Sequence, residues 1–198
     1  ADIALLGIDR DQEALEAARP MLADSDNDVY LARGGFAEMG AFAAARGWAG
    51  VDGVVFDLGI SSMQLDDAAR GFSFERNGPL DMRMGREQRK TAASLLNQAD
   101  ELELRRIFRE FGEEPRAAAL ARAIVQDRRR RQWTETAELA ELVERVAGGG
   151  GRARARKAKA RVFQALRIAV NDELAQVEAG LRARSEEHTS ELQSLLII

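Results

Sequence analysis

The feature that most constrains the fold of this chain is an apolar run that leads into an acidic residue and a glycine turn. Val54–Asp66 reads Val-Val-Phe-Asp-Leu-Gly-Ile-Ser-Ser-Met-Gln-Leu-Asp, so Asp57 ends an expected strand. This order is typical of an open α/β sheet, which binds its ligand beyond the carboxyl ends of its parallel strands. Two later runs, Arg70–Phe74 and Gly78–Met84, are rich in residue types that build ligand-binding loops rather than cores. We therefore expect function to concentrate between residues 57 and 84.

The segment before Asp57 alternates between strand-like and helix-like patterns. Short apolar runs predict strands over Ile3–Ile8, Val29–Ala32 and Val51–Phe56, and apolar residues at helical spacing separate them. Strands that alternate with helices predict a parallel, doubly wound sheet.

The sequence after residue 84 has helical periodicity and no strand signal. Helices are expected around residues 102–108, 117–125 and 137–146. From Phe163, apolar residues recur at intervals of three and four as far as Leu181, which predicts one long helix with an apolar face.

These patterns divide the chain into four expected parts. Residues 1–84 form the sheet domain with its active-site loops, residues 85–158 an all-α insert, and residues 159–183 a helix that returns to the sheet. Residues 184–198 resemble a translated DNA sequencing adapter, so we expect a non-native tail there.

Composition excludes several classes of protein. The 198 residues include no cysteine and a single histidine, His188, which falls in the expected tail. Disulfides, thiolate zinc sites and a Ser-His-Asp hydrolase are therefore excluded, and no metal site is expected. No apolar run reaches the roughly 20 residues of a membrane span, and no signal peptide is visible, so we expect a cytoplasmic protein.

Charge is distributed unevenly along the chain. Residues 1–100 hold 10 basic and 17 acidic side chains, whereas residues 101–161 hold 16 basic and 10 acidic ones. The basic excess lies in Arg128–Arg131 and Arg152–Arg161. Such a patch attracts polyphosphate, so nucleic acid is a candidate partner; a solvated, partly disordered basic loop is the alternative.

Four residues are candidates for ligand contacts. Asp9 and Asp57 each end an expected strand, where an acid can accept hydrogen bonds from ribose hydroxyls; helix capping and a turn are the respective alternatives. Phe36 could stack on a nucleobase or serve as a core residue at the start of a helix. Gln64 lies in a loop of amides and hydroxyls that suits adenine, or it is an ordinary turn residue.

Six runs in a fixed order carry a family resemblance: Gly7–Asp11, Phe56–Ser62, Gln64–Asp66, Arg70–Phe74, Gly78–Met84 and Phe163–Asn171. Together they resemble the ribosomal RNA small subunit methyltransferase H family, and the similarity covers residues 3–183. That family transfers a methyl group from S-adenosylmethionine to the exocyclic N4 of a cytidine in the decoding region of 16S ribosomal RNA. The resemblance implies an α/β fold: a partial class I, Rossmann-like methyltransferase sheet with an all-α insert domain.

The resemblance also implies contacts for the candidate residues. Asp9, Phe36, Asp57 and Gln64 would bind the cofactor, S-adenosylmethionine. No catalytic residue is assigned, although Asp57 is placed to accept a hydrogen bond from the cytosine amine. The basic insert would grip the backbone of 16S ribosomal RNA in the small ribosomal subunit, near a base that must be splayed out.

Two other functions fit part of the sequence. An acid at the end of an early strand also suits a nicotinamide-dependent Rossmann oxidoreductase. The basic helices on their own suit a non-enzymatic RNA-binding module.

Members of the family begin with a strand and a turn containing Gly-Gly-His, and they have further strands after the last helix. We expect this chain to be a fragment that lacks both parts. The polypeptide should then bind S-adenosylmethionine very weakly and should not methylate RNA. Calorimetric titration of the purified chain measures this binding, and tight binding would contradict the expectation.

Overall fold

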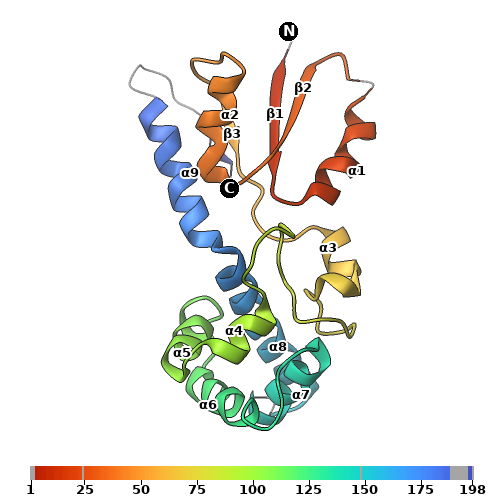
Figure 1. The fold of residues 1–198 in the computed structure, drawn as a ribbon, viewed down its shortest axis with the longest axis vertical. Helices are drawn as coiled ribbons and strands as arrows, with labels where there is room; N and C mark the ends of the chain where they lie inside the picture. Colours follow the sequence, from red (N-terminus) through yellow and green to blue (C-terminus); the bar gives the residue numbers. More distant parts are fainter. Residues whose placement is uncertain (1–2, 24, 148, 188–195, 198) are drawn as a thin grey trace. The chain divides into compact units, whose positions relative to one another are not determined.

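The computed structural model describes residues 3–23, 25–147, 149–187 and 196–197, which form two compact units (Figure 1). The first unit combines Ala1–Gly59 with Glu173–Ile198, and the second is the continuous segment Ile60–Asp172. Within the described ranges, no helix is long and apolar enough to cross a membrane. The expected tail falls mostly outside these ranges, and so does His188.

The first unit is built on a parallel pair of strands. Strand β1 (Ala4–Asp9) and strand β2 (Asp28–Arg33) pair in register from Ala4 with Asp28 to Asp9 with Arg33. Helix α1 (Gln12–Leu22) connects them, and the side chain of Asp11 caps its first turn by accepting a hydrogen bond from the Glu13 N–H. The predicted strand, helix and strand are confirmed here.

The third strand of the expected parallel sheet is short and does not pair with the first two. Strand β3 covers only Val54–Val55, and among the described residues it pairs with β4 (Leu196–Ile197) rather than with β1 or β2. Asp52 and Gly53, which have low strand propensity, shorten the expected strand from its start. The described chain therefore forms two separate two-stranded parallel sheets, and the doubly wound sheet is seen only in part.

Aromatic packing joins the remaining elements of the first unit. These are the short 3₁₀ helix η1 (Phe36–Glu38), helix α2 (Met39–Ala45) and helix α9 (Glu173–Glu187). The rings of Phe36 and Phe56 meet edge to face with centroids 5.3 Å apart. A Cβ atom on Gly180 of α9 would lie 3.0 Å from Phe36 and 3.2 Å from Phe56, so α9 packs closely against both residues.

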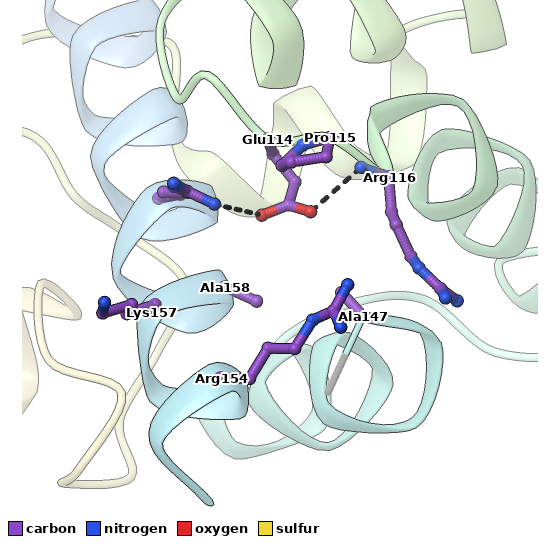
Figure 2. Close-up of a pocket in the computed structure, with 8 residues that line it drawn as sticks. Glu114, Pro115, Arg116, Ala147, Arg154, Lys157 and Ala158 are labelled. Carbon is purple, nitrogen blue, oxygen red and sulfur yellow. Dashed lines mark hydrogen bonds and ion pairs between the residues drawn. The ribbon is translucent and has the colours of Figure 1, made fainter. Parts of the chain in front are cut away.

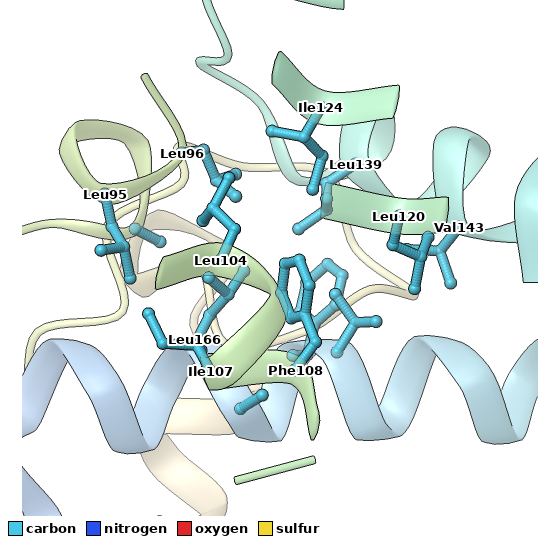
Figure 3. Packing of buried hydrophobic residues seen from close by; sticks show 14 of the residues in the cluster. Leu95, Leu96, Leu104, Ile107, Phe108, Leu120, Ile124, Leu139, Val143 and Leu166 are labelled. Atoms are coloured by element: carbon cyan, nitrogen blue, oxygen red, sulfur yellow. The ribbon is translucent and has the colours of Figure 1, made fainter. Parts of the chain in front are cut away.

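The second unit is helical and has one extensive core. Its elements are α3 (Ser62–Asp66), η2 (Ala68–Arg70), α4 (Ala92–Gln98), α5 (Glu101–Glu110), α6 (Ala117–Asp127), α7 (Thr136–Ala147) and α8 (Arg152–Asn171). Figure 3 shows Phe108 of α5 surrounded by aliphatic side chains from neighbouring helices, and its side chain is completely buried. The helices predicted around residues 102–108, 117–125 and 137–146 are confirmed.

The loops between residues 70 and 84 contribute to this core, which corrects our expectation that they serve ligand binding rather than packing. Phe72, Leu80 and Met82 are nearly fully buried members of the hydrophobic cluster. Gly71 turns the chain at φ 72°, and a Cβ atom there would lie 2.0 Å from the Pro79 carbonyl oxygen. The loop thus folds tightly on itself and places its apolar side chains inward.

The expected single helix over residues 159–183 is wrong, because the chain breaks at Asp172. This residue adopts the left-handed conformation (φ 52°, ψ 41°) after α8, and its N–H donates to the Ile168 carbonyl. Aspartate tolerates this conformation better than most residues. The apolar residues beyond the break do not extend one buried face, since Leu174 is 57% and Leu181 is 41% exposed, and α8 and α9 belong to different units.

The carboxamide of Asn171 ties the end of α8 to the buried loop. Its Oδ1 accepts a hydrogen bond from the Met84 N–H (2.7 Å), and its Nδ2 donates to the Met82 carbonyl (2.8 Å) and the Arg167 carbonyl (2.9 Å). Asn171 is 1% exposed, so water cannot replace these bonds.

We expect Asn171→Ala to lower the free energy of unfolding by about 2–4 kcal/mol, because it leaves the buried Met82 carbonyl and the part-buried Met84 N–H without their partner. Gln164→Ala is the matched control on the same helix, since Gln164 is exposed and makes one long bond of 3.4 Å; its effect should stay within about 0.5 kcal/mol. Urea denaturation of both variants measures the difference, and equal stabilities would contradict the role of Asn171.

A carboxylate–guanidinium pair makes the same loop sensitive to pH. Arg83 donates to both carboxylate oxygens of Asp81, at 2.7 and 2.8 Å, and its backbone N–H donates to one of them. Burial raises the pKa of Asp81, but the hydrogen bonds and charge of Arg83, together with the charge of Arg70, outweigh burial and lower the pKa below its usual 3.8.

A lowered pKa in the folded state stabilises the fold above the unfolded-state pKa, and this contribution is lost as the pH falls through the folded-state pKa. Asp81→Asn should therefore cost about 1 kcal/mol at neutral pH, and the gap from the parent should close below pH 3.8. Urea titrations at graded pH measure this. In Asp66→Asn, which alters an exposed pair with Arg76, the difference should be small at every pH.

Candidate functional site

Asp9 lies at the carboxyl end of β1, beside the end of β2. The Asp9 carbonyl accepts a hydrogen bond from the Gly34 N–H (3.0 Å), so the Gly34-Gly35 turn follows β2 at the same edge of the sheet. The Asp9 Oδ1 atom accepts from the Asp11 N–H (2.7 Å), and the residue is exposed. Asp11 is the helix cap, and Asp9 orients the segment that leads to it.

Phe36 follows this turn and is half-buried. Its ring contacts Phe56, and its Cβ faces α9, as described above. These contacts are those of a packing residue, which was the alternative to nucleobase stacking. They also tie the end of β2 to the end of β3, since Phe56 directly follows Val55.

Asp57 is exposed and comes directly after Phe56. The contact between Phe36 and Phe56 therefore brings Asp57 into the same neighbourhood as the end of β2. Asp9, Phe36 and Asp57 all belong to the first unit, at the ends of its strands. The exposed acids at the end of β1 and beyond the end of β3 can accept hydrogen bonds from hydroxyl or amine groups of a ligand.

Gln64 belongs to the second unit, where it is buried in the first turn of α3. Its Oε1 accepts a hydrogen bond from the Ser61 N–H (3.1 Å), and its own N–H donates to the Ser61 hydroxyl (3.1 Å). This reciprocal pair is a capping box. The structure thus gives Gln64 a role in starting α3.

The basic series Arg152–Arg161 is helical, because α8 begins at Arg152. This finding is against the alternative of a disordered loop. Part of the series is paired: Arg156 with Glu75 (3.1 Å) and Lys159 with Glu144. The hydrogen bond and charge of Lys159 lower the pKa of Glu144.

Two residues of the other basic run, Arg128–Arg131, also make contacts within the protein. Arg128 donates to the carbonyls of Leu96 and Ala99 at the end of α4, and Arg131 pairs with Glu138 (2.7 Å). Arg129 and Arg130 are exposed, and within the described ranges neither makes an ion pair or side-chain hydrogen bond. These two side chains are available to a polyanion.

A small pocket in the second unit was missed by the sequence analysis. It has a volume of about 110 Å³ and lies between the turn before α6, the end of α7 and the first half of α8 (Figure 2). Its lining residues are Glu114, Pro115, Arg116, Ala147, Arg154, Lys157, Ala158 and Arg161. We call it the Glu114 pocket. No local pattern marks it, because its walls come from segments about 40 residues apart; the basic residues of α8 were the only signal.

The sequence was compared with known proteins. It matches the MraW methylase family over residues 1–195. It is 48% identical over 183 residues to the ribosomal RNA small subunit methyltransferase H of Methylococcus capsulatus, covering 92% of this chain and 60% of the relative. The protein of the same name from Chlorobium chlorochromatii is 52% identical over 176 residues, covering 86% and 53%.

The protein of that name from Solidesulfovibrio magneticus is 49% identical over 181 residues, which cover 90% of this chain and 56% of the relative. The chain thus spans about half the length of the curated relatives it matches. The family match nevertheless extends over nearly all of the chain, and the chain belongs to the MraW methylase family.

Proposed function

We propose that the protein carrying this chain methylates the exocyclic N4 of a cytidine in the decoding region of 16S ribosomal RNA, with S-adenosylmethionine as the methyl donor. The observation that carries this proposal is the family match over residues 1–195. The name shared by relatives that are 45–52% identical supports the same reaction. A nicotinamide-dependent oxidoreductase receives no support from these matches.

The residues at the strand ends of the first unit fit the cofactor in part. The exposed carboxylates of Asp9 and Asp57 are suited to ribose hydroxyls and to polar groups at the reacting end. Phe36 can contact adenine only with the part of its ring that Phe56 and α9 leave uncovered. A contact from Gln64 remains part of the proposal, alongside its role in the capping box.

S-adenosylmethionine, when bound, would supply an electrophilic sulfonium methyl group. The cytosine amine is a weak nucleophile because its lone pair is delocalised into the ring, so the protein must hold the amine in line with the methyl group. An exposed carboxylate just beyond a strand, such as Asp57 two residues after β3, can do this by accepting a hydrogen bond from the amine. We assign this positioning role to Asp57.

The helical unit would hold the RNA partner. Arg129, Arg130, Arg152 and Arg154 are exposed, and within the described ranges their side chains make no ion pair or hydrogen bond. Such side chains can neutralise phosphates along an RNA strand. We propose that the small ribosomal subunit presents the cytidine and that the protein meets this subunit in the cytoplasm.

We expect Asp57→Asn to reduce the rate of methyl transfer by about 10²-fold, since the amide cannot accept from the amine as well as a carboxylate. The assay uses a protein that contains this chain and has the full length of its relatives. It is incubated with small ribosomal subunits and labelled S-adenosylmethionine, and the modified nucleotide is then mapped. Asp52→Asn, which changes an exposed acid ahead of β3, is the control and should retain the rate.

A methylated product other than N4-methylcytidine would overturn the proposed function. An unchanged rate in Asp57→Asn would remove only the role given to Asp57.

A further inference from the structure

The loop that leads to Leu80 is joined to the start of α7 by a short antiparallel backbone pairing. The Leu80 N–H donates to the Thr134 carbonyl (2.8 Å), and the Thr136 N–H donates to the Gly78 carbonyl (2.8 Å). The Gly78 N–H in turn donates to the hydroxyl of Thr136 (3.0 Å), which is completely buried. We call residues 77–80 and 134–137 the α7 joint; all of them belong to the second unit.

Asn77 closes the joint on its solvent side. Its Oδ1 atom accepts a hydrogen bond from the Ala137 N–H (3.1 Å) in the first turn of α7, although Asn77 itself is exposed. The first N–H groups of a helix have no partner within the helix, so Asn77 acts as a cap from 60 residues earlier in the chain. The same hydrogen bond holds the carboxamide of Asn77 in one position.

Packing requires a glycine directly after Asn77. Gly78 is buried, and a Cβ atom there would clash with the Ala68 carbonyl. An asparagine that precedes glycine is also the pair most prone to spontaneous deamidation, because glycine has no side chain to hinder attack of its nitrogen on the carboxamide. The α7 joint therefore combines a strict packing requirement with a chemically reactive pair of residues.

We propose that Asn77 is a deamidation site, which the closed α7 joint keeps unreactive and which opening of the joint releases. In the reaction the Gly78 nitrogen loses its proton and forms a bond to Asn77 Cγ, the bond from Cγ to Nδ2 breaks, and ammonia leaves. Water then opens the five-membered imide to aspartate or to isoaspartate, in which the backbone runs through the former side chain. The net reaction consumes water and releases ammonia, without oxidation or reduction.

Two contacts of the closed joint oppose the first step. The Gly78 N–H must lose its proton before its nitrogen can attack, and it is buried and bonded to the Thr136 hydroxyl, which donates to the Arg76 carbonyl (3.2 Å). The Asn77 carboxamide must also turn toward that nitrogen, and its bond with the Ala137 N–H prevents this. Both restraints are lost when the first turn of α7 separates from the loop, which is a local opening rather than global unfolding.

The two products differ in their effect on the fold. Aspartate keeps an oxygen for the Ala137 N–H, and its negative charge is favourable at the start of a helix. Isoaspartate inserts a methylene into the backbone directly before Gly78, where the Ala68 carbonyl and the Thr136 hydroxyl leave no room for a shift. The joint of an isoaspartate chain cannot close again, so repeated opening converts the protein irreversibly.

Mass spectrometry measures the reaction directly, because trypsin cleaves after Arg76 and Arg83 and releases the peptide that begins with Asn77. The full chain is incubated in mildly alkaline buffer with and without denaturing urea, and aspartate and isoaspartate forms of the peptide are separated by chromatography. We expect deamidation at Asn77 to be at least about tenfold slower in the folded chain than in urea, since only the open joint reacts.

Variants of Thr136 test the restraint on the Gly78 N–H. Thr136→Val removes the acceptor and should raise the rate in buffer about tenfold, whereas Thr136→Ser keeps a hydroxyl and should keep the parent rate. Thr134→Val makes the same change at an exposed side chain that has no hydrogen bond within the described ranges, so it is the matched control and should also keep the parent rate.

Urea denaturation of each variant gives the fraction that is globally unfolded in buffer. A rise in Thr136→Val beyond this fraction supports local release, and a rise that the fraction explains overturns the proposal. Equal rates for the folded and the unfolded parent, or equal rates for Thr136→Val and Thr134→Val, overturn it as well. Asn77→Asp should melt within about 3 °C of the parent, because aspartate keeps the cap; a larger loss contradicts the difference between the two products.

Discussion

The hydrogen bonds of Asn171 are the interaction on which the second unit depends most. One buried carboxamide serves Met82 and Met84, which lie almost ninety residues earlier in the chain. These bonds fix the path of a loop that would otherwise leave polar backbone groups in an apolar interior. They also allow Met82, at φ 60°, to remain fully buried. The helices around Phe108 then close over a loop whose course is already set.

Local periodicity predicted the helices well, because each buries one face against a shared core. α5, α6 and α7 appear where apolar residues recur at helical spacing. The break at Asp172 could not be seen in this way, since the apolar stripe continues through it while the two helices pack in different units. The burial of Leu80 and Met82 was hidden by the polar and glycine residues around them.

The candidate site likewise has residues that the sequence could indicate and residues that it could not. Asp9 and Asp57 could be proposed because strand ends in an α/β sheet are a recognisable position, and Phe36 and Gln64 because of their residue types; the family resemblance then implied a cofactor contact for all four. The burial of Glu114 could not be predicted, because its ion pair with Arg161 (3.9 Å) forms only after α8 has packed beside the turn before α6. A buried acid next to distant basic residues is visible in three dimensions and not along the chain.

The discontinuous course of the first unit has a consequence for biosynthesis. The second unit is one continuous segment, Ile60–Asp172, and it can bury its core as soon as that segment is synthesised. The first unit requires α9, which is separated from Phe36 by the entire second unit. Contacts between such distant segments form slowly, because the chain must first close a long loop. The folded helical unit shortens that loop, so its early completion would speed the docking of α9 on Phe36 and Phe56.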